Sequence, residues 1–119
     1  MAGMEQPRTS TIPGAFAMVV RFTLTEGHEQ AFDELMTHTV AEIHRHEPGT
    51  LAYVVHHVEG EPRTRIFYEL YADLAAFEYH ETAPHIIRFA AERARHLDKV
   101  QVDRLSLFAH AGLRAATAA

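Results

Sequence analysis

The chain has 119 residues, of which 47% are hydrophobic, and a formal net charge of -5 when its histidines are neutral. This length suits one domain with one core, and the acidic balance argues against binding to nucleic acids or to an anionic membrane. The sequence has no cysteine, which excludes disulfides, thiolate catalysis and zinc–thiolate sites.

The two ends differ in composition from the middle of the chain. Residues 1–15 have no apolar core and therefore do not resemble a secretory signal; a flexible tail is expected there. Residues 112–119 are rich in alanine, and a second flexible tail is expected. One domain is predicted over residues 16–111. No run of about 18 apolar residues is present, so a cytoplasmic protein without a transmembrane helix is expected.

The first half of the domain predicts a strand and a long helix. Residues 17–25 alternate, with Met18, Val20, Phe22 and Leu24 on one face. Residues 28–47 carry apolar side chains at helical spacing from Phe32 onward. Pro48 and Gly49 end this helix because neither residue continues a helix well.

The second half predicts a hairpin, two helices and a last strand. Strands are expected at 50–59 and 64–72, joined by residues 60–63. Asp73 is a suitable N-cap for a short helix ending near Thr82. Pro84 suits the first turn of another helix, ending near Leu97. A fourth strand is expected at 100–110.

This order, β-α-β-β-α-β, predicts an α+β ferredoxin-like fold: a four-stranded antiparallel sheet with helices on one face. The second and third strands in chain order are apolar on both faces, whereas the strands of a sheet with one solvent-exposed face alternate apolar and polar residues. We therefore predict that a second copy of the chain covers the open face, giving a homodimer of the dimeric α+β barrel type. The alternative is that the tails cover this face.

Several histidines have spacings that suggest metal ligands. His38, Glu42 and His46 share one helical stripe, but the stripe faces away from the predicted core and is expected to be solvated. His80 and His85 are five residues apart with Pro84 between them, whereas a zincin requires two histidines four apart on one unbroken helix. No metal site is predicted.

A pocket is predicted where the third strand runs into the broken helix. Glu69 and Tyr71 share one strand face, and His80 and His85 flank the helix break. These four residues are the candidate catalytic residues. A half-buried histidine near a carboxylate is suited to proton transfer near neutral pH. The alternative is that Glu69 is a structural carboxylate and His85 caps a helix. The expected apolar walls, which are the candidate substrate-binding residues, are Val20, Phe22, Tyr53, Phe77 and Phe89.

Other common catalytic motifs are missing from the sequence. It contains no GxGxxG, P-loop or GxSxG pattern. Nucleotide-binding, flavin-binding and serine-hydrolase functions therefore have no support, and no cofactor is predicted.

The residues from about Met18 to Phe108 resemble the antibiotic biosynthesis monooxygenase-like proteins, which are dimeric α+β barrels. The segments that carry the resemblance are Val20-Arg21-Phe22 before Glu26-Gly27, Glu47-Pro48-Gly49-Thr50-Leu51-Ala52-Tyr53, Tyr68-Glu69-Leu70-Tyr71-Ala72-Asp73, Ala75-Ala76-Phe77-Glu78-Tyr79-His80 and Thr82-Ala83-Pro84-His85.

This resemblance implies oxidation of a quinol or an aromatic polyketide-type substrate by dioxygen without a cofactor. It implies that His80 and His85 are catalytic, with His85 as base or substrate orienter, and that Glu69 matches the strand glutamate of the family. Tyr71 stands where many members carry Trp, which disfavours direct anthrone oxidation. The positions that haem-degrading members need are occupied by Val20, Tyr71 and Ala90, so haem degradation is not expected.

Two other functions fit the same residues. One is a proton-transfer isomerase that acts in the same pocket without oxygen uptake. The other is a non-catalytic dimer that binds a small molecule. All three functions predict a homodimer. The expected small-molecule partner is an aromatic or quinol-like substrate, and neither nucleic acid nor a membrane is expected as a partner.

Overall fold

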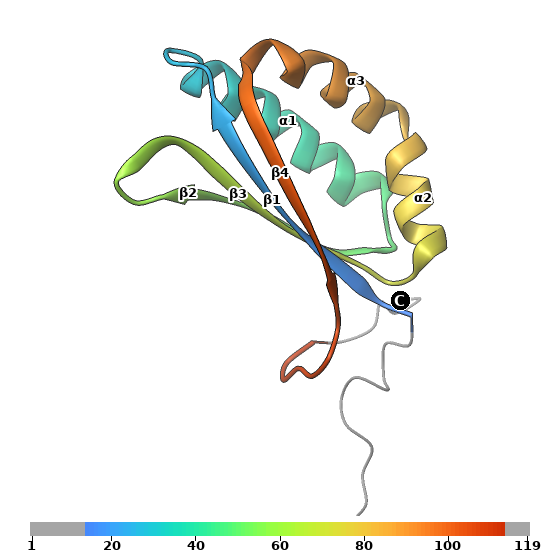
Figure 1. Cartoon of the computed structure of the whole chain (residues 1–119). Coiled ribbons are helices and arrows are strands. Elements are labelled where there is room, and N and C mark those ends of the chain that lie inside the picture. Colours follow the sequence, from blue (N-terminus) through green and yellow to red (C-terminus); the bar gives the residue numbers. More distant parts are fainter. Residues whose placement is uncertain (1–13, 114–119) are drawn as a thin grey trace, which may run out of the picture.

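The computed structural model describes residues 14–113 (Figure 1). The predicted tails, residues 1–15 and 112–119, lie almost wholly outside this range. The elements in chain order are β1 (Phe16–Leu24), α1 (Glu29–His46), β2 (Thr50–Val58), β3 (Glu61–Tyr71), α2 (Leu74–Thr82), α3 (Pro84–Arg93), the 3₁₀ turn η2 (Ala94–His96) and β4 (Leu97–Ser106).

The four strands form one antiparallel sheet in the order β2-β3-β1-β4. The helices pack on one face of this sheet, as Figure 1 shows. The predicted α+β ferredoxin-like fold is therefore confirmed. Its two layers enclose the space in which side chains from β1, β2, β3, α2 and α3 meet.

The core lies between the helices and the sheet and is rich in phenylalanine. Phe22, Phe32, Phe67 and Phe89 are each at most 2% exposed. The ring of Phe22 packs edge-on against Phe32 and Phe67, with centroids 5.7 and 4.8 Å apart, which is a favoured aromatic geometry. This core fixes the position of α3 over the sheet.

Predicted boundaries are wrong in two parts of the chain. The hairpin turn is shorter than predicted, because Gly60 adopts a φ of +81° and lets β3 begin at Glu61. The last strand begins at Leu97, which pairs with Leu24, and ends at Ser106, instead of spanning 100–110. The turn at 94–96 ends the preceding helix early, so Leu97 belongs to the strand.

The face of the sheet opposite the helices carries apolar side chains that the described residues only partly cover. Val19, Ile66 and Tyr68 are half-buried there, and Val54 is exposed. Within residues 14–113, no helix combines the length and the apolar character needed to cross a membrane.

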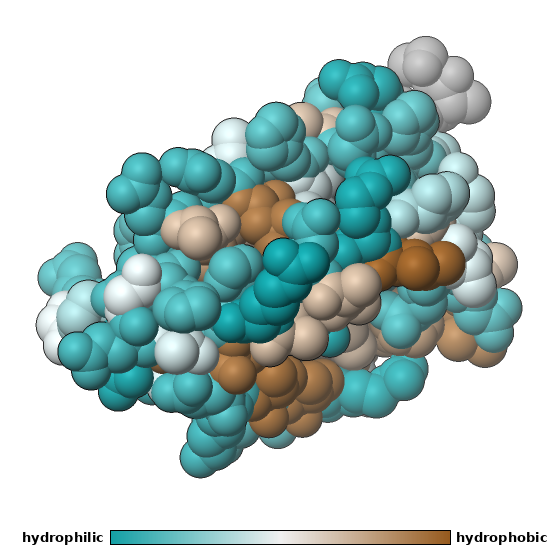
Figure 2. All heavy atoms as spheres, turned by 90° about the horizontal axis from the view of Figure 1, so that it is seen from above, coloured by the Kyte–Doolittle hydropathy of each residue, from teal (hydrophilic) through white to brown (hydrophobic). Residues whose placement is uncertain are grey.

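A second apolar surface lies on the helix side, along the outer strand β4. Val100 and Val102 of β4 and Ile87 of α3 are exposed. The face drawn in Figure 2 is mainly hydrophilic, with hydrophobic side chains gathered in separate patches. The α3–β4 patch matters for function because the same three side chains line a cavity near the helix break.

Candidate functional site

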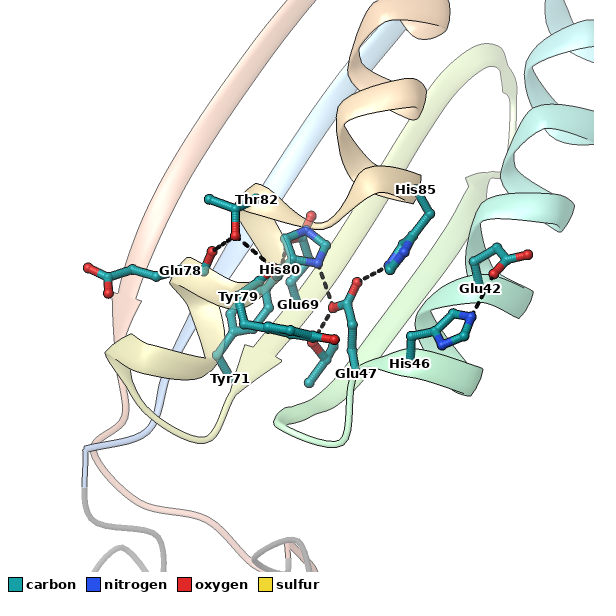
Figure 3. Close-up of polar contacts among 11 residues, drawn as sticks. Glu42, His46, Glu47, Glu69, Tyr71, Glu78, Tyr79, His80, Thr82 and His85 are labelled. Atoms are coloured by element: carbon teal, nitrogen blue, oxygen red, sulfur yellow. Dashed lines mark hydrogen bonds and ion pairs between the residues drawn. The ribbon is translucent and has the colours of Figure 1, made fainter.

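The break between α2 and α3 places two histidines on the same buried carboxylate. Asp73 starts α2 by accepting a hydrogen bond from the backbone N–H of Ala76 at 2.8 Å, which confirms the predicted N-cap. Ala83 is extended (φ -68°, ψ 140°), because a residue before proline disfavours the helical conformation. The chain therefore turns between His80 and His85, and both side chains point toward Glu47 (Figure 3).

Glu47 lies just past the last residue of α1, and its side chain is 1% exposed. Its Oε1 is 2.7 Å from His80 Nδ1 and accepts a hydrogen bond of 2.6 Å from the hydroxyl of Thr50. Its Oε2 makes a short contact with His85 Nε2. Three side chains from three segments thus converge on one carboxylate.

Gly49 allows the loop that carries Glu47 to approach α2 closely. A Cβ atom at this position would lie 2.6 Å from the Cβ of Ala76, which is too close for any real contact. The loop is also tied to the end of β3 by a hydrogen bond of 2.9 Å from the Ala72 N–H to the Gly49 carbonyl. Glycine is therefore required here by the close approach of two segments.

The hydrogen bonds decide the charge of Glu47. Burial alone would raise its pKa, but the hydrogen bonds from His80, Thr50 and His85 outweigh this effect, and the pKa is lowered. Glu47 is therefore ionised at neutral pH and only accepts hydrogen bonds. Each neutral histidine must then donate to it, through Nδ1 in His80 and Nε2 in His85, which leaves His80 Nε2 free to accept a proton.

Glu69 and Tyr71 form a second buried pair, on β3. The Tyr71 hydroxyl donates a hydrogen bond of 2.5 Å to Glu69 Oε1, and both residues are at most 5% exposed. Burial raises the pKa of Glu69, and the hydrogen bond from Tyr71 only partly offsets it. Burial, together with the neighbouring carboxylate of Glu69, also raises the pKa of Tyr71 far above its usual range, so this hydroxyl stays protonated.

A cavity of about 430 Å³ opens beside these groups, between α3 and the sheet. Glu69 and His80 line this cavity, and Tyr71, which donates to Glu69, does not. The structure brings all of the predicted wall residues to this cavity: Val20, Phe22, Tyr53, Phe77 and Phe89. An apolar cavity with a few convergent polar groups is typical of a small-molecule site.

His85 does not line this cavity. It contacts Glu47 from the other side and lines two grooves on the outer surface of the helices. One groove lies between α1 and α3, and the other lies beside the α2–α3 break. The structure therefore separates the two predicted histidines: His80 faces the cavity and His85 faces away from it.

Two residues of the site were missed in the sequence. The sequence contains one weak indication of the role of Glu47. A carboxylate at the C-terminal end of a helix is unfavourably placed in the helix dipole and needs hydrogen-bond donors to stabilise it. For Arg93 the sequence contains no such indication. Its guanidinium lies in the cavity, 5.2 Å from the ring centroid of Phe22 and 5.3 Å from that of Phe89. Within residues 14–113, no carboxylate lies within ion-pair distance of Arg93.

The remaining histidines lie away from the cavity. His46 pairs with Glu42 at 3.1 Å on an exposed stripe of α1, and His57 contacts Asp33 at 3.1 Å. In the part of the chain that the structure describes, no three His, Asp or Glu side chains are arranged to hold a metal ion.

Comparison with known proteins places this fold in a family. The family model for antibiotic biosynthesis monooxygenase matches residues 15–92. No curated protein matches the sequence.

Solved structures agree with this result. A "putative antibiotic biosynthesis monooxygenase" from Bacteriodes thetaiotaomicron superimposes with a TM-score of 0.79 at 17% identity, covering 87% of this chain and 97% of the other. A similarly described protein from Caulobacter crescentus gives 0.77 at 18% identity, with 85% and 96% covered. A protein from Pseudomonas aeruginosa gives 0.75 at 26% identity, with 82% and 98% covered.

The matched segment contains β1, α1, the Glu47 loop, β2, β3, α2 and most of α3, and therefore every polar group of the site except Arg93. The chain belongs to the antibiotic biosynthesis monooxygenase family.

Proposed function

We propose that the protein is a cofactor-independent monooxygenase that oxidises a quinol or an aromatic polyketide-type substrate with dioxygen. Membership of the family supports a monooxygenase-like function in general. The observation that carries the specific proposal is the Nε2 atom of His80, which Glu47 keeps free as a base at the edge of an apolar cavity. Activation of an acidic, electron-rich substrate needs such a base and shelter from water.

The reaction starts with proton transfer from an activated CH₂ or OH group of the substrate to His80 Nε2. The resulting carbanion, or the phenolate formed from an OH group, passes one electron to dioxygen, and the substrate radical and superoxide combine into a carbon-bound peroxide. For a CH₂ substrate, the peroxide takes back the proton from His80 and then loses water. The net change is CH₂ + O₂ → C=O + H₂O, so no other reductant is needed.

Arg93 is suited to stabilise the anion formed in this reaction. The half-buried Arg93 lies with its guanidinium over two phenyl rings and lines the same cavity as His80 and Glu69. A fixed cation next to developing negative charge stabilises the transition state most in a site with little water. Glu69, with its raised pKa, is suited to hydrogen-bond a substrate oxygen.

Oxygen consumption by purified, metal-free protein tests this function. With a panel of hydroquinones and anthrones, we expect turnover that falls about 100-fold or more in His80→Ala, because a positioned general base contributes at least that factor. His38→Ala, which changes an exposed histidine outside the cavity, is the matched control and retains activity. Turnover that His80→Ala leaves unchanged contradicts the proposal.

A proton-transfer isomerase is the second candidate, and Glu69 favours it. The cavity holds a base, His80, and a carboxyl with a raised pKa, Glu69. Two groups of this kind remove and return a proton at different atoms of one substrate. This function predicts turnover of keto-type substrates without oxygen uptake, and the same electrode measurement separates it from the first.

We also propose that the open face of the sheet is covered by a second copy of the chain. The support is a set of apolar side chains on this face that the described residues only partly cover: Val19, Val54, Ile66 and Tyr68. In strands with one solvent-exposed face, polar residues would occupy these positions. Light scattering at micromolar concentration is expected to give twice the chain mass. A monomer at that concentration contradicts this part of the proposal.

A further inference from the structure

His85 is a buried titratable group that the proposed reaction does not use. It is 7% exposed, contacts Glu47 Oε2 through Nε2, and lies outside the cavity. Its ring instead lines a groove of about 380 Å³ at the α2–α3 break, with Glu42, His46, Tyr79 and Arg88. His85 therefore lies between the outer surface of the helices and the carboxylate that positions His80.

We infer that His85 is a positioning residue which, through the shared carboxylate of Glu47, makes the basicity of His80 depend on the protonation of the outer groove. This inference rests on the role proposed for His80. His85 then changes the basicity of His80 and does not contact the substrate.

The coupling follows from the way the carboxylate is shared. His80 holds Glu47 Oε1 and His85 holds Oε2, so the two rings are separated by one carboxylate group. A neutral His85 donates only a hydrogen bond, whereas a protonated His85 adds a full positive charge at the same place. That charge competes for the negative charge of Glu47 and disfavours protonation of His80. Two ionisable groups that interact strongly titrate as a pair and not as separate residues.

Other charged and titratable groups surround both histidines. On the groove side these are Glu42, His46 and Arg88, and further along the α1–α3 groove Glu34, His38, Glu92 and His96. On the cavity side these are Glu69, Glu81 and Arg93, with the phenols of Tyr53 and Tyr71. Both sets contain both signs of charge. The direct link through Glu47 is the shortest connection between them.

The test is an NMR titration of the His80 imidazole in the substrate-free protein, with the signal assigned by its loss in His80→Gln. We expect a two-step titration in the unmodified protein, because His85 protonates beside it. In His85→Gln, whose amide nitrogen replaces Nε2 as a neutral donor, we expect the second step to disappear and one step to remain. The control, His38→Gln, changes a groove histidine that does not contact Glu47 and leaves the two steps in place.

The outcomes separate this inference from the proposed function. A single-step titration in the unmodified protein, or identical curves with and without His85→Gln, overturns the coupling even if the protein oxidises its substrate. Two steps that merge in His85→Gln support the coupling even if no oxygen is consumed. Where activity is found, its pH profile is expected to shift in His85→Gln in the same direction as the His80 curve. The two-step curve of the unmodified protein tests the coupling without relying on the variant to fold.

Discussion

The two buried glutamates of the site, Glu47 and Glu69, have the same side chain and nearly the same burial, at 4% and 5% exposure. Their pKa values nevertheless move in opposite directions. Glu47 accepts hydrogen bonds from three side chains, whereas Glu69 accepts one, from Tyr71. Burial raises the pKa of both carboxyl groups, and the larger number of hydrogen-bond donors around Glu47 is what lowers its pKa below the ordinary value.

This difference assigns distinct roles to the two carboxyl groups. The charged one lies behind His80 and fixes its tautomer, while the one with the raised pKa reaches the cavity itself. Pairs of titratable groups with opposite shifts are the usual mark of an acid–base site.

The largest effect is expected for Glu47→Gln, which removes the negative charge that distinguishes Glu47 from Glu69. An amide cannot attract two imidazole N–H groups as a carboxylate does, and its own NH₂ group faces one of them as a second donor. We expect a loss of about 3 kcal/mol in the free energy of unfolding, measured by urea denaturation. Activity is expected to fall at least as far as in His80→Ala. A variant as stable as the unmodified protein would show that the three hydrogen bonds contribute little.

A milder change, Thr50→Val, removes one of the three donors and keeps the volume of the side chain. We expect a loss of about 1.5 kcal/mol, typical of a hydrogen bond to a charged group, and a rise in the pKa of Glu47. Because this pKa lies below the ordinary value of 4.5, Glu47 stabilises the fold above that pH, and the stability is lost as the pH falls through the folded value. The acid limb of the stability curve should therefore move to higher pH, and an unmoved limb would contradict the account.

The smallest effect is expected for Glu69→Gln, and it has the opposite sign. The pKa of Glu69 is raised above its ordinary value of 4.5, so the folded protein loses stability as the pH rises from 4.5 through the folded value. The amide keeps an acceptor for Tyr71 and avoids burying a charge. We expect the variant to be more stable by about 1 kcal/mol at pH 8 and unchanged at pH 4. A loss of stability at pH 8 would show that ionised Glu69 is well satisfied.

The sequence predicted the fold because its local signals agree with each other. Each signal identifies one element by itself: the alternation from Met18 to Leu24 indicates a strand, Asp73 caps a helix, and Pro84 starts another. None of these signals depends on residues far away in the sequence. The wall residues followed from the same patterns, because the apolar face of a strand under helices must face the interior.

The charge arrangement could not be predicted in this way. Glu47 is 33 residues from His80 and 38 from His85, and no periodicity links a loop to two later helices. The separation of His80 from His85 depends on the angle of the break at Ala83, which a proline signals but does not specify. Arg93 reaches the cavity only because α3 lies over Phe22, which is a property of the packed layers.

In the proposed site, ionised Glu47 holds His80 as a base that faces the cavity. The tautomer of neutral His80 is the most direct measurement of this arrangement. Nitrogen-15 NMR of the imidazole distinguishes a ring protonated at Nδ1 from one protonated at Nε2. In neutral His80, we expect a proton on Nδ1 and none on Nε2. A neutral His80 that carries its proton on Nε2 would contradict it, because the base would then point at the carboxylate and not at the cavity.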